Sequence, residues 1–210
     1  MSEGRLIDDI PTDWREALAA TIDSPPFRDI EEFLAQERAR TDAAIYPPES
    51  LVFAALRLTP LTSVRAVILG QDPYYKEGLA TGLAFSVPDG CEHPLSLRNI
   101  MKARELDLDL PVPVNGSLDQ WARNGVLLLN AALTVPRHDA ERHLDFWSPF
   151  TDEIVKTVVA LPWPVAFLLW VRISLKWPCQ SARNGHPGSG FWPPPRRPRQ
   201  RPTRGVDFIP

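Results

Sequence analysis

The chain has 210 residues, of which 44% are hydrophobic and 23% charged, so it is long enough for one folded domain with its own core. The N-terminus is acidic where a signal peptide is basic and apolar, and no apolar run reaches the roughly 18 residues of a membrane span, so we expect a soluble, cytoplasmic protein. The net charge of -3 is uneven: residues 171–210 hold eight Lys and Arg and one acid, whereas residues 1–170 hold 15 and 25.

Helical periodicity dominates the first sixty residues. It predicts helices over 13–20, 25–44 and 51–58, the second of them capped by Ser24. A nearly continuous apolar segment follows at 64–69, which is typical of a strand buried on both faces of a parallel sheet.

Further strands and helices alternate through the middle of the chain. The apolar run at 126–129 predicts a second buried strand, and the one at 164–170 predicts a third apolar strand. Helices are expected from about Ser96, Ser117 and Thr151, with Ser96 and Thr151 as candidate caps. Gly125 is the expected left-handed end of the helix that follows Ser117. The order predicts an α/β fold of three layers, α/β/α, around a central parallel sheet.

Two polar residues stand where buried strands end. Asp72 follows the strand at 64–69, after a tight exit at Gly70 and before the rigid Pro73, and Asn130 ends the strand at 126–129. Ligands of open α/β sheets bind at the carboxyl ends of the strands, so Asp72 and Asn130 are expected to converge there. Alternatively, Asp72 caps a turn.

Four motifs together resemble a known family. They are GQDPYY at 70–75, GLAFSV at 82–87, LLLNAALTV at 127–135 and FLLW at 167–170. In this order and spacing they are similar to the uracil-DNA glycosylases of the family 1 type, over roughly residues 45–170.

The resemblance implies hydrolysis of the bond between uracil and deoxyribose. Its transition state carries positive charge on the sugar and negative charge on uracil, which calls for an acid near the sugar and donors near the base. By similarity, Asp72 positions the attacking water and stabilises the cation, and Gln71 contacts uracil O2. The alternative for Gln71 is a polar residue that closes the turn.

The same resemblance assigns the residues that select uracil. Tyr74 fills the space of a thymine methyl group, Phe85 stacks on the base, and the amide of Asn130 matches O4 and N3–H. Taken singly, Phe85 is more typical of a core residue and Asn130 of a strand-end cap. Their occurrence together with GQDPY favours the binding role.

DNA contacts are implied at three further positions. Pro94 and Ser96 resemble the family's loop against the DNA backbone, and His143 is similar to a histidine near DNA, although a plain surface histidine is the alternative. The implied partners are single-stranded and double-stranded DNA that contain uracil, and a monomer is expected. No metal or organic cofactor is called for, and Cys91 and Cys179 lack the spacing of a zinc site.

Two departures from the family pattern stand out. Tyr75 replaces the histidine that usually follows the tyrosine of GQDPY. After Trp170, Val171 replaces a glycine, and no fourth strand is recognisable. The family's HPSP loop carries a histidine that donates to uracil O2, and a wedge residue follows it. The nearest counterpart of this loop here is His186 to Ser189. The alternative is that this His-Pro pair occurs by chance.

The change near Trp170 divides the chain. We expect a glycosylase-like domain over 1–170 and a divergent, Pro/Arg-rich, poorly ordered tail over 171–210. Our hypothesis for this change is a shift of reading frame near Trp170, which translating the underlying DNA in the other two frames tests. The expected function is a DNA repair glycosylase of reduced activity, and the alternative is an inactive remnant that only binds nucleic acid.

Overall fold

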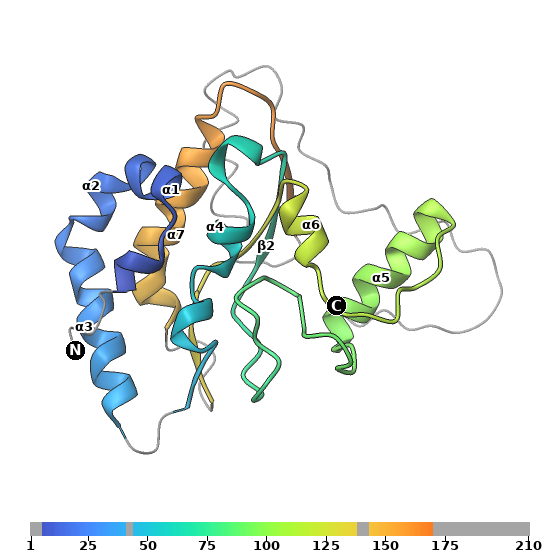
Figure 1. The fold of residues 1–210 in the computed structure, drawn as a ribbon, viewed down its shortest axis with the longest axis horizontal. Coiled ribbons are helices and arrows are strands. Elements are labelled where there is room, and N and C mark those ends of the chain that lie inside the picture. The colour runs from blue at the N-terminus through green and yellow to red at the C-terminus, as the bar shows by residue number, and fades with distance from the viewer. Residues whose placement is uncertain (1–5, 41–43, 138–142, 170–210) are drawn as a thin grey trace.

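The computed structural model describes residues 6–40, 44–137 and 143–169. Over these ranges the chain forms a parallel sheet, a short antiparallel strand pair and a set of surrounding helices (Figure 1). The helices are η1 (Leu6–Asp9), α1 (Thr12–Ala17), α2 (Ala19–Ile22), α3 (Pro25–Ala39), η2 (Glu49–Leu51), α4 (Ala54–Leu58), η3 (Leu61–Ser63), α5 (Leu95–Leu108), α6 (Asp119–Arg123) and α7 (Leu144–Val159). The strands are β1 (Ile45–Tyr46), β2 (Ala66–Gly70), β3 (Val126–Asn130), β4 (Val135–Pro136) and β5 (Ala166–Leu169).

The parallel sheet has the order β3-β2-β5, so β2 is its central strand within the described residues. Its register pairs Val67 with Leu127 and with Phe167, and Gly70 with Asn130. The last four residues of both β2 and β3 are buried, as their continuous apolar sequence predicts. The predicted α/β fold with a parallel sheet is therefore confirmed.

Helices lie on both sides of β2 (Figure 1). The group α1, α2, α3 and α7 lies on one side of β2 in this view, α6 lies on the other, and α5 projects away from the rest of the chain. Aromatic residues join α3, α4 and α7: the Phe150 ring lies 5.0 Å from Phe27 and 5.9 Å from Phe53. Burial of these side chains is the main stabilising term for the layer.

Helix boundaries depart from the sequence predictions at several points. The helix predicted to reach residue 44 ends at Ala39, and the one predicted over 51–58 is divided into η2 and α4. Ser24 does stand at the N-cap of α3, but its hydroxyl donates to Thr21 O and forms no capping bond. Gly125 follows α6 with φ of 89°, which confirms the predicted left-handed end.

The predicted cap at Thr151 is wrong, because α7 begins about two turns earlier, at Leu144. Pro149 lies inside this helix and costs it one backbone hydrogen bond. The fully buried Trp147 and Phe150 flank Pro149, and their packing outweighs that cost. Thr151 is also fully buried, and its hydroxyl lies 3.0 Å from Ala131 O outside α7 and 3.1 Å from Trp147 O within the helix.

Several predictions fall on residues that the structure does not describe. The fourth strand of the family and the tail over 171–210 lie outside the described residues. Within them, none of the helices has the length and apolarity that crossing a bilayer requires.

The contact between α7 and the segment after β3 predicts a stability effect. Thr151→Val keeps the shape of the side chain but leaves the buried Ala131 carbonyl without its donor, so we expect the free energy of unfolding in urea to fall by roughly 1–3 kcal/mol. Thr157→Val, at a partly exposed position of the same helix, is the control and should stay within about 0.5 kcal/mol of the unaltered chain. Equal losses in both variants would contradict this role for Thr151.

Candidate active site

The carboxyl ends of β2 and β3 are tied together beyond the last paired residues. Ala131 N–H donates to Gly70 O at 3.0 Å, and Ala132 N–H donates to Gln71 O at 2.9 Å. These bonds continue the strand pairing up to the residue before Asp72. Asp72 itself is partly exposed. Asp72 and Asn130 therefore leave the sheet from adjacent strand ends, as the sequence predicts.

Gly70 is required for space rather than for its backbone conformation. Gly70 is predicted to permit a tight exit from the strand, but it lies in β2 and its φ is not positive. A Cβ atom there would lie 2.2 Å from Asn130 Oδ1 and 3.0 Å from Ala84 Cβ. The buried amide of Asn130 thus lies over Gly70, beside the segment that carries Phe85.

Phe85 has a strained backbone. Its φ is +66°, in the left-handed region that bulky side chains rarely adopt and that costs about 1–3 kcal/mol. Both neighbours are fully buried and anchored: Ala84 N–H donates to Leu128 O at 3.0 Å, and Ser86 Oγ accepts from Leu118 N–H at 3.0 Å. These anchors impose the turn at Phe85, whose side chain stays partly exposed.

Tyr74 links the GQDPY segment to Phe85. Its hydroxyl donates to Phe85 O at 3.2 Å and lies 3.0 Å from Ser96 Oγ. Burial raises the pKa of the Tyr74 hydroxyl, and the hydrogen bond with Ser96 opposes part of that rise. Tyr74 therefore keeps its hydroxyl hydrogen at neutral pH and can hold the Phe85 carbonyl.

Ser96 is predicted to cap a helix, but it does not. Pro94 is the N-cap of α5, and Ser96 is the second residue of that helix. Because its hydroxyl is bonded to Tyr74, Ser96 joins the start of α5 to the segment that carries Phe85. Tyr74, Phe85 and Ser96 are thus connected to one another, whereas the family resemblance implies a separate contact for each of them.

His143 is fully buried, so its interpretation as a surface histidine is wrong. It is the N-cap residue of α7, its Nδ1 lies 2.8 Å from Thr134 Oγ1, and its ring meets Phe33 edge-on at 5.0 Å. Trp147 Nε1–H also donates to Thr134 Oγ1, at 2.7 Å. His143 thereby fixes the segment that follows β3. His186 and Ser189 lie outside the described residues.

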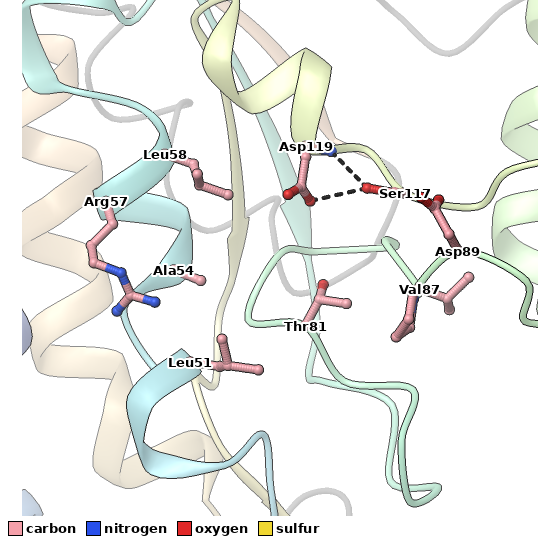
Figure 2. A pocket seen from close by; sticks show the side chains of 10 residues that line it. Leu51, Ala54, Arg57, Leu58, Thr81, Val87, Asp89, Ser117 and Asp119 are labelled. Atoms are coloured by element: carbon pink, nitrogen blue, oxygen red, sulfur yellow. Dashed lines mark hydrogen bonds between the residues drawn. The ribbon is translucent and has the colours of Figure 1, made fainter.

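A cavity of about 450 Å³ lies between α4, the loop at 81–89 and the start of α6 (Figure 2). Leu51, Ala54 and Thr81 form part of its wall, and the Ser117 hydroxyl beside it is bonded to Asp119. None of the predicted site residues that the structure describes lines this cavity. Within the described ranges, no group of three His, Cys, Asp or Glu residues could hold a metal ion.

The buried anchors of the Phe85 segment were not predicted from the sequence. Ser86 is one example, because its side chain fixes Leu118 from a fully buried position. The available signal was a single polar residue inside the apolar run GLAFSV, since a buried hydroxyl needs a hydrogen-bond partner.

The strain at Phe85 predicts an unusual order of stability. Phe85→Gly should unfold in urea with a free energy about 1 kcal/mol higher than Phe85→Ala, because glycine adopts φ of +66° at no steric cost. The control is Leu106, exposed on helix α5, where Leu106→Gly should be less stable than Leu106→Ala. The same order at both positions would show that Phe85 is not strained.

Comparison with known proteins agrees with this arrangement. The model of the uracil DNA glycosylase superfamily matches residues 57–176. The chain is similar to uracil-DNA glycosylase 2 of Streptomyces coelicolor, at 46% identity over 168 residues that make up 80% of this chain and 73% of the relative. It is also similar to a uracil-DNA glycosylase of Pseudomonas aeruginosa, at 48% identity over 75% of this chain and 68% of the relative.

Among solved structures, the chain resembles the mimivirus uracil-DNA glycosylase, with a TM-score of 0.76 and 25% identity. The similarity covers 82% of this chain, which spans 65% of the mimivirus chain. Since the family model matches more than half of the sequence, the chain belongs to the uracil DNA glycosylase superfamily.

Proposed function

We propose that this chain removes uracil from DNA by hydrolysing the bond between the base and deoxyribose, the first step of base-excision repair. The relatives named uracil-DNA glycosylase support this activity. The observation that carries the proposal is the junction of the GQDPY and LLLN segments by the two hydrogen bonds past β2 and β3, with the Phe85 segment packed beside it. We also propose that the protein acts as a monomer in the cytoplasm.

Asp72 is the proposed catalytic residue. At the end of the central strand, its carboxylate orients the attacking water and stabilises the positive charge that develops on the sugar as the C1′–N1 bond breaks. The neighbouring Gln71 is fixed through its carbonyl, which accepts from Ala132, and contacts uracil O2 as negative charge gathers there. Water supplies the hydroxyl group on C1′ and a proton to the departing uracil.

Base selection falls to three side chains that the described contacts hold in place. The Asn130 amide, packed over Gly70, pairs with O4 and N3–H of the flipped base. The Phe85 ring stacks on uracil, and Tyr74 occupies the volume that a thymine methyl group would need. The bond from Tyr74 to Phe85 O keeps these two residues in a fixed relation.

The DNA backbone is proposed to meet the start of α5, at Pro94 and Ser96. The first intrahelical bond of α5 is donated by Arg98, and Leu97 is fully buried, so the amides of residues 95 and 96 are the ones offered to phosphate oxygens. Such contacts suit residues 1–170, whose excess of acids provides no general attraction to DNA. His143 acts only by shaping the segment after β3, because it is buried.

Residues 171–210 form the last part of the proposal. We propose that 1–170 is the glycosylase domain and 171–210 a divergent tail, and the family match that ends at residue 176 supports a boundary in this region. His186 and Ser189 are its candidates for the uracil O2 donor and a backbone contact. If they do not take these roles, excision will be slower than in relatives with the HPSP loop. The comparisons do not favour the alternative of a DNA-binding remnant.

Replacing the catalytic acid tests the activity directly. Asp72→Asn should lower the single-turnover rate of uracil release from a single-stranded oligonucleotide at least about a hundredfold, because the neutral amide does not stabilise the sugar cation. Asp89→Asn, at an exposed acid of the 81–89 loop, should keep the full rate. Equal rates in Asp72→Asn and the unaltered chain, or no release by either, would contradict the proposal.

The space above Gly70 provides a second test. Gly70→Ala would displace the Asn130 amide, so the same release assay should show at least about a tenfold loss, the effect of one misplaced hydrogen-bonding group. Gly90→Ala adds the same methyl group where no atom lies within 4 Å, and should cost roughly 1 kcal/mol of stability without slowing release. Full activity in Gly70→Ala would show that Asn130 does not read the base.

A further inference from the structure

The C-terminal half of α5 contacts little of the described protein. Leu97 and Met101 are the buried residues of this helix, and every residue from Lys102 to Leu108 is at least partly exposed. The helix projects from the rest of the chain (Figure 1). Most of the stability of a helix in a protein comes from the packing of its apolar face, so this half of α5 lacks its usual stabilising term.

Apolar side chains are concentrated at this end of α5 and in the loop that follows it. Arg104 donates to Pro111 O at 3.2 Å, so the start of the loop lies against the helix. We call residues 102–114 the α5 surface. Five of the eight large hydrophobic residues exposed in the described ranges belong to it, and they are between 41% and 92% exposed: Leu106, Leu108, Leu110, Val112 and Val114. Exposed apolar groups gathered in this way mark interaction sites.

The α5 surface is also acidic where a helix favours positive charge. Glu105, Asp107 and Asp109 alternate with leucines, and the last turn of α5 contains no basic residue. The C-terminal end of a helix carries a partial negative charge, so it repels these acids, which also repel one another. None of the three forms an ion pair with a residue that the structure describes. A basic partner would relieve this repulsion.

We propose that the α5 surface binds the basic tract at residues 191–204 of the same chain. This tract, FWPPPRRPRQRPTR, contains five arginines and no acid, so its charge is opposite to that of the α5 surface. Its two aromatic residues and five prolines supply apolar rings to cover the exposed leucines. The prolines also limit the conformational entropy that the tract loses on binding. This contact goes beyond the proposed function and does not depend on it.

The tract is long enough in its connection to reach the α5 surface of its own molecule. Residues 170–190 separate it from the end of β5, and an extended chain of that length spans up to about 70 Å. The radius of gyration of a folded domain of about 170 residues is only about 16 Å. A tether of this kind gives the tract a local concentration of roughly 1 mM. Binding within one chain is therefore favoured over binding between two chains in dilute solution.

Hydrogen–deuterium exchange of the full chain tests this contact. The amides of residues 102–110 should exchange at least about tenfold faster when the five arginines of the tract are replaced by serine, because the bound tract stabilises the end of the helix. The substitutions are Arg196→Ser, Arg197→Ser, Arg199→Ser, Arg201→Ser and Arg204→Ser. The amides of β2 should exchange equally in both proteins, which shows that the fold is intact.

A second pair of variants tests whether the acids of the α5 surface receive the tract. In a chain with Glu105, Asp107 and Asp109 replaced by lysine, the five arginine substitutions should no longer accelerate exchange at residues 102–110. The control replaces three acids of α1 and α3 by lysine, and the acceleration should persist in it. These three are Glu16, Asp29 and Glu32.

The leucines are tested in the same way. The acceleration caused by the arginine substitutions should shrink in a Leu106→Ser background, because the tract then covers less apolar area. It should keep its full size in a Leu95→Ser background, since Leu95 is a similarly exposed leucine at the other end of α5.

Equal exchange at residues 102–110 with and without the five arginines would overturn the proposal. The same acceleration in both lysine backgrounds would also overturn it, because the acids of the α5 surface would then play no part. Slow exchange that disappears when the unaltered chain is diluted would contradict binding within one molecule and would identify the tract of a second copy as the occupant.

Discussion

Two backbone hydrogen bonds past the ends of β2 and β3 hold the site together. Through Gly70 O and Gln71 O, they extend the pairing of two buried strands to the residue that precedes Asp72. The strand pair lies in the core, so the bonds at its end are shielded from water and resist local opening. An acid and an amide from chain positions 58 residues apart thereby share one edge of the sheet.

Further hydrogen bonds fix the two segments that lie beside this edge of the sheet. Thr151 and His143 fix the segment after β3, and Ala84 and Ser86 fix the two ends of the turn at Phe85. The strained backbone of Phe85 is maintained by buried neighbours, in the way that functional sites commonly store strain. The aromatic packing between α3, α4 and α7 stabilises the fold and offsets the cost of this strained turn.

The sequence was informative where local physics decides the outcome. Continuous apolar runs predicted where β2, β3 and β5 lie, although no described residue of β5 is buried. The strand ends also predicted that Asp72 and Asn130 lie near one another in the fold. It failed where contacts between distant segments decide. Thr151 has the residue type of a cap but is buried inside α7, and Gly70 is needed for the Asn130 side chain, which no local pattern reveals. The left-handed turn at Phe85 likewise depends on anchors to β3 and Leu118.

We propose that Asn130 and Phe85 bound one space that receives a pyrimidine, at the strand end that delivers Asp72. The most direct measurement is a crystal structure of the full chain soaked with uracil. We predict electron density for the base stacked on Phe85, with its O4 and N3 edge on the Asn130 amide. Uracil bound instead in the cavity beside Leu51 and Thr81, with the Phe85 face empty, would contradict the account.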